Sequence, residues 1–122
     1  PQPLSPEPAV RDPLVKAYGH VYPVTPALYA ALESALHDAL NDDEDVPLLC
    51  QEGDMARISM EGSYFPEDEV VEAFRAHLTP DMQGELDVLD MAGWRLTRHV
   101  FTGGQVKSSS APLNNVLDYS GH

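Results

Sequence analysis

The sequence is poor in cysteine and in basic residues. Cys50 is the only cysteine among 122 residues, which excludes an internal disulfide and any zinc or iron–sulfur site built from several cysteines. Seven Lys and Arg stand against twenty Asp and Glu, so the formal net charge is −13. Binding to nucleic acid or to an anionic membrane surface through charge neutralisation requires clustered cations, and we therefore expect neither.

Long apolar runs and a secretory signal are also lacking. No stretch approaches the roughly 20 apolar residues that span a bilayer, and the N-terminus has no charged segment followed by an apolar one. The expected compartment is therefore the cytoplasm. A hydrophobic content of 43% in a chain of this length predicts one globular domain with its own core.

Prolines are concentrated near the N-terminus, where the first 26 residues hold seven of the eleven. Such a composition is typical of an extended arm or linker. The sequence therefore predicts an arm over residues 1–24 and a single acidic α+β domain over residues 25–122.

Two segments have the apolar periodicity of a helix. Thr25 and Pro26 provide a capping hydroxyl and a proline at the first helical position, and leucines and alanines then follow at helical spacing, which predicts a helix over 26–41. An acidic first turn and a final Thr79-Pro80 bound a second helix over 66–78. These two helices are expected to pack on an antiparallel sheet.

The strands of that sheet are predicted in two groups. The first is a hairpin of segments 46–51 and 55–61, and the second is a C-terminal three-strand meander that ends near 105–110. A turn at Ala92-Gly93 would place Asp87 opposite Arg98 and Asp90 opposite Arg95, as an antiparallel ladder favours. In the same register Trp94 lies opposite Met91, and Trp94 is expected to pack in the core.

Negative charge is concentrated in the middle of the chain. Residues 33–90 hold seventeen Asp or Glu and only two Arg. The leading hypothesis is therefore a non-enzymatic interaction or regulatory domain that binds a basic protein partner. The candidate binding residues are an acidic run and a nearby aromatic pair: Asp42, Asp43, Glu44, Asp45, Tyr64 and Phe65.

The alternative hypothesis is a small enzyme or a ligand-binding domain with a pocket between the sheet and the 66–78 helix. Its polar groups would be His77, His99, Arg57 and Arg98. The histidines lack metal-ligand spacing, and the glycines form no phosphate-binding loop before a helix. The sequence therefore predicts no metal, no cofactor and no assigned catalytic residue.

Overall fold

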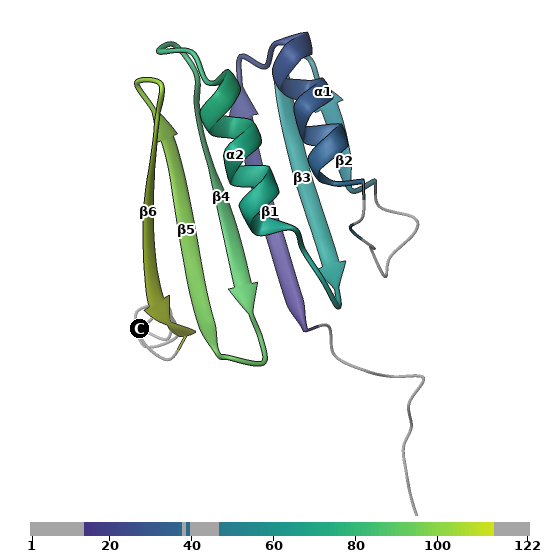
Figure 1. Ribbon diagram of the computed structural model, residues 1–122, viewed down its shortest axis with the longest axis vertical. Coiled ribbons are helices and arrows are strands. Elements are labelled where there is room, and N and C mark those ends of the chain that lie inside the picture. The colour runs from purple at the N-terminus through teal and green to yellow at the C-terminus, as the bar shows by residue number, and fades with distance from the viewer. Residues whose placement is uncertain (1–13, 38, 40–46, 114–122) are drawn as a thin grey trace, which may run out of the picture.

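The computed structural model describes residues 14–37, 39 and 47–113, and this part of the chain forms one six-stranded antiparallel sheet with two helices on one face (Figure 1). The strand order is β2-β3-β1-β4-β5-β6. The α+β class is confirmed. In chain order the elements are β1 (Val15–Tyr22), α1 (Pro26–Ala35), β2 (Leu49–Glu52), β3 (Met55–Gly62), α2 (Glu67–His77), β4 (Gln83–Asp90), β5 (Arg95–Thr102) and β6 (Gln105–Pro112).

Strand β1 was not predicted, because it lies within the stretch interpreted as an extended arm. It occupies the interior of the sheet and pairs with β3 on one side and β4 on the other. Ala17, Gly19 and Val21 are buried beneath the helices, while the alternate residues face away from them. Because β1 lies between β3 and β4 and joins the two predicted strand groups, the predicted arrangement of a hairpin and a meander alone is not confirmed.

Helix α1 begins where the capping chemistry predicts. The Thr25 Oγ accepts a hydrogen bond from the Leu28 N–H at 3.2 Å, and Pro26 occupies the first turn. The helix ends at Ala35, well before the predicted residue 41, because the chain then continues through tighter turns. The Ala39 N–H, for example, bonds the Leu36 carbonyl three residues back.

Helix α2 covers the core over the middle of the sheet. Its buried side includes Val70 and Phe74, and the Phe74 ring stacks on that of Phe101 from β5 with ring centroids 3.9 Å apart. Leu28 and Leu32 of α1 are fully buried in the same core. The core therefore lies between the helices and one face of the sheet.

The β4–β5 pairing has the predicted register, with Asp87 opposite Arg98 and Asp90 opposite Arg95. The Arg98 guanidinium donates to both carboxylate oxygens of Asp87, at 2.8 and 2.9 Å. The connection is longer than a two-residue turn and includes Trp94, whose φ of 56° is left-handed. Trp94 is 41% exposed, so the expectation that it packs in the core is wrong.

Candidate interaction groove between the two helices

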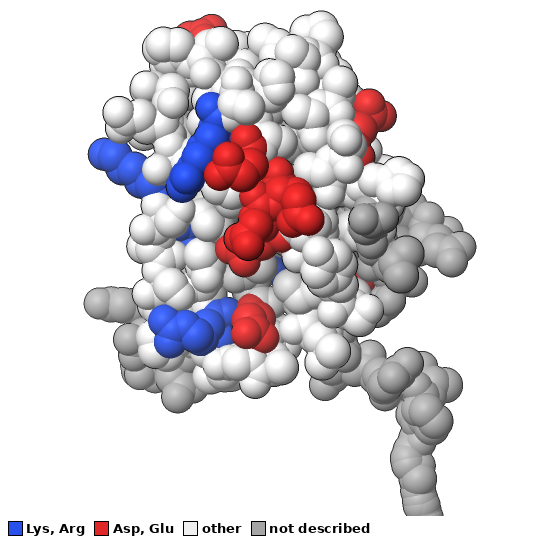
Figure 2. Space-filling view, viewed as in Figure 1, with Lys and Arg blue, Asp and Glu red and all other residues white. Residues whose placement is uncertain are grey.

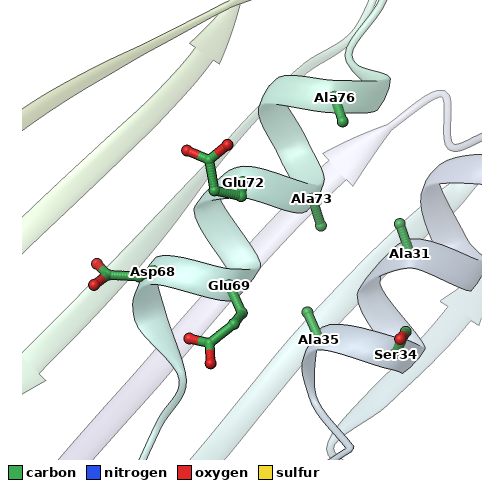
Figure 3. A pocket seen from close by; sticks show the side chains of 8 residues that line it. All are labelled: Ala31, Ser34, Ala35, Asp68, Glu69, Glu72, Ala73 and Ala76. Carbon is green, nitrogen blue, oxygen red and sulfur yellow. The ribbon is translucent and has the colours of Figure 1, made fainter.

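A groove with a volume of about 620 Å³ runs along the outer surface between α1 and α2 (Figure 3). Its apolar lining consists of alanines from both helices, and their spacing along each helix places them on the same side. Ala31 and Ala35 are four residues apart on α1, and Ala73 and Ala76 are three apart on α2, so each pair lies on one helical face. Side chains of this size leave a hollow above the seam where the helices meet.

The polar lining of the groove is mainly acidic and comes from α2. Asp68, Glu69 and Glu72 are exposed along its rim, whereas α1 contributes Ser34. The first two carboxylates lie in the first turn of α2, where the helix dipole stabilises negative charge. Figure 2 shows Asp and Glu side chains gathered over this part of the helical face. The groove is therefore apolar at its base and negatively charged along one wall.

One basic residue lies close to this acidic wall. The Arg75 guanidinium is 3.9 Å from the Glu72 carboxylate, and both side chains are more than half exposed. Such a pair is weak in water. Arg75 offsets part of the negative charge at Glu72, and the three carboxylates still leave this wall with a net negative charge.

His99 forms the main polar link between α2 and the sheet. It is only 6% exposed, and its Nδ1 and Nε2 atoms lie 2.7 Å from the Ser108 Oγ on β6 and from the Glu67 Oε2 on α2, respectively. A proton on Nε2 is donated to the Glu67 carboxylate, and Nδ1 and the Ser108 hydroxyl share a second hydrogen bond whose direction depends on the tautomer of the ring.

A serine, an imidazole and a carboxylate in series also occur in acyl-transfer enzymes, which need a substrate cavity at the serine. The groove between the helices is lined by other residues, and so is the hollow on the opposite face of the sheet. The two hydrogen bonds of His99 connect the first turn of α2 to β5 and β6.

The four polar residues proposed for an enzyme pocket do not converge between α2 and the sheet. Arg57 and Arg98 lie on the sheet face away from the helices, where they pair with Glu52 at 3.4 Å and with Asp87. His77 is the last residue of α2, and His99 is buried with Glu67. No described pocket brings these groups together.

The sheet face away from the helices carries a smaller hollow of about 210 Å³. Tyr18, His20, Arg57 and Glu85 contribute to its lining. The Tyr18 hydroxyl donates to the Glu61 carboxylate, and burial, together with that bond, raises the pKa of Tyr18 to about 12. Charges of both signs alternate on this face: Lys16, Arg57, Arg98 and Lys107 with Glu52, Glu61, Glu85 and Asp87.

The candidate binding residues from the sequence fall in different places. The acidic run Asp42, Asp43, Glu44 and Asp45 lies outside the described residues. Tyr64 is 50% exposed just before α2, whereas Phe65 is 7% exposed and packs in the core. Of the aromatic pair, Tyr64 is the one whose side chain reaches the surface.

Among residues 14–37, 39 and 47–113, no cluster of three or more His, Cys, Asp or Glu side chains could hold a metal ion. In the same part of the chain, neither helix has the length and apolar character needed to cross a membrane. Cys50 is half-buried on edge strand β2, opposite Arg57.

No family model, no curated protein and no solved structure matches this chain. A functional interpretation therefore depends on the geometry of its own surfaces.

Proposed function

We propose that this chain is a non-enzymatic, acidic interaction domain that binds a positively charged segment of a partner protein in the groove between α1 and α2. The observation that carries the proposal is the combination of an alanine-lined base with three carboxylates along one wall. The alanines leave apolar surface for a partner to bury, and the carboxylates attract cations and repel phosphates. A basic protein partner is therefore favoured over a nucleic acid.

The two parts of the groove would contribute differently to binding. Burial of apolar surface at the alanines supplies affinity that depends weakly on salt. The carboxylates lie on an exposed rim, where they raise the association rate and discriminate against acidic partners more than they add affinity. The acidic run at residues 42–45 of the sequence would extend the same long-range attraction.

The proposal is tested with a probe peptide of about 18 residues that combines leucine and lysine, titrated into ¹⁵N-labelled protein. We expect amide shifts to concentrate at the groove alanines, Ala31, Ala35, Ala73 and Ala76. The variant Asp68→Asn, Glu69→Gln, Glu72→Gln should weaken binding about tenfold, since three exposed ion pairs contribute roughly 0.5 kcal/mol each.

A matched control separates the groove from net charge. The variant Glu52→Gln, Asp54→Asn, Glu85→Gln changes the charge by the same amount, but none of these residues lines the groove. We expect it to weaken binding about twofold or less. Equal weakening by the two variants, or amide shifts spread over the other sheet face, would show that the peptide recognises overall charge and not the groove.

A further inference from the structure

We infer that the segment bound in the groove is an amphipathic α-helix with its Lys and Arg residues along one flank only. This inference rests on the proposed function and specifies the conformation and charge pattern of the partner. Hydrogen bonding at the base of the groove favours a helical partner. Between their ends, α1 and α2 use their main-chain N–H and C=O groups in their own helical bonds, and alanine side chains carry no polar atoms.

An extended segment lying on this base would bury main-chain groups that find no partner there. Such unpaired groups are costly, and extended peptides bind well chiefly where a free sheet edge can pair with them. A helix satisfies its own main-chain groups and presents only side chains. The alanine base therefore favours a helical occupant over an extended one.

Side-chain packing above the seam between α1 and α2 also favours a helix. Small side chains on both walls keep the surface above the seam low and open to solvent, so no side chain of the lining alanines blocks the approach of a third helix. A helix laid along the seam would insert large apolar side chains between the ridges of α1 and α2, as in ordinary helix packing. We therefore expect leucine, methionine or phenylalanine at every third or fourth position of the partner.

Negative charge lies on only one side of the groove. All three carboxylates of the lining belong to α2, while the α1 wall contributes Ser34 and alanines. Asp68 and Glu72 are four residues apart and lie on the same face of α2. They match two cations spaced three or four residues apart on one flank of the partner helix, and its other flank faces a wall without charge.

Three synthetic peptides of about 18 residues test the inference by fluorescence anisotropy and far-UV circular dichroism. The first has leucines at every third and fourth position with all lysines on one flank. The second divides the same lysines between both flanks. The third is the first with two central residues replaced by proline, which breaks the helix. We expect the first to bind at least tenfold more tightly than the third and threefold more tightly than the second, with a gain in helical signal on binding.

Two protein variants connect these affinities to the groove. Ala31→Leu fills the hollow from the α1 wall and should weaken the first peptide at least tenfold. Ala111→Leu, on the sheet face away from the helices, should change its affinity less than twofold. If Ala31→Leu lowers the melting temperature, Ala76→Leu repeats the test from the α2 wall, where the side chain is exposed.

A different result would contradict each part of the inference. Equal binding of the first and third peptides, both weakened by Ala31→Leu, would overturn the helical occupant and leave the groove as a binding site. Equal binding of the first and second peptides would overturn the one-sided charge pattern. If neither Ala31→Leu nor Ala76→Leu weakens any peptide, the proposed function itself is wrong.

Discussion

Replacing Glu67 with alanine should destabilise the fold by about 1.5 kcal/mol. The change removes the carboxylate that accepts from the Nε2–H of His99 and leaves that donor unpaired on a ring that is only 6% exposed. A hydrogen bond to a charged group contributes about 1.5–3 kcal/mol, and we take the lower end because the Glu67 side chain is 33% exposed. For a domain of this size the loss corresponds to a fall of roughly 6 °C in the melting temperature.

The control is Asp68→Ala, which removes another carboxylate from the first turn of α2. It loses the same favourable interaction with the helix dipole, about 0.5 kcal/mol, but no bond to His99 is involved. Urea unfolding should be followed by far-UV circular dichroism, because Trp94 is already partly exposed in the folded chain and reports unfolding weakly by fluorescence.

A double-mutant cycle makes the test sharper. The combined variant Glu67→Ala, His99→Leu has no imidazole N–H left without an acceptor. Its loss in unfolding free energy should therefore be smaller, by about 1 kcal/mol, than the sum of the losses in the two single variants. A coupling energy below roughly 0.3 kcal/mol, or equal destabilisation by Glu67→Ala and Asp68→Ala, would refute the role of this link in holding α2 on the sheet.

Three further predictions concern other parts of the chain. Spectrophotometric titration should find that Tyr18 ionises near pH 12, and Glu61→Gln should lower that pKa. Because the pKa of Tyr18 is raised in the folded state, its neutral hydroxyl contributes fully to stability below pH 10, and this contribution is lost as the pH rises to 12. Gly84→Ala should cost about 3 kcal/mol or prevent folding, since the added Cβ would lie 2.0 Å from the His20 carbonyl oxygen of β1, and urea unfolding measures the loss. Neutralising Asp42, Asp43, Glu44 and Asp45 to Asn or Gln should leave the melting temperature unchanged or raised. The same variant should associate more slowly with the lysine peptide, with a flatter salt dependence between about 50 and 300 mM; identical rates would mean that this acidic run takes no part in binding.

The elements that could be predicted from the sequence are those specified by near neighbours. The start of α1 follows from Thr25 and Pro26, and the acidic first turn marks the start of α2. The β4–β5 register follows from Asp87 and Arg98, which are close along the chain and opposite in charge. In each case the stabilising contact lies within the segment or within one hairpin, so the local pattern is sufficient.

The elements that were missed depend on partners far away in the chain. The inward-facing residues of β1 include a glycine, so its alternation of apolar and polar residues is a weak strand signal in the sequence. Pairing with β3 and β4 on both sides is what places this segment in the sheet. The groove was missed for a similar reason. Ala31 and Ala35 share one face of α1, but only the position of α2 beside α1 determines that they line a groove.

The interior position of β1 has a consequence for synthesis on the ribosome. This strand is made well before one of its two partners, because β4 begins at Gln83, about sixty residues after β1 ends at Tyr22. At about 5–20 residues per second the ribosome needs roughly 3–12 seconds to supply it. During that interval β1 can pair at most with β3, once Met55–Gly62 has been made, and the edge later covered by β4 is open to other chains. Mutations that slow translation of the segment between β1 and β4 should therefore increase aggregation of the nascent chain without changing the stability of the folded protein.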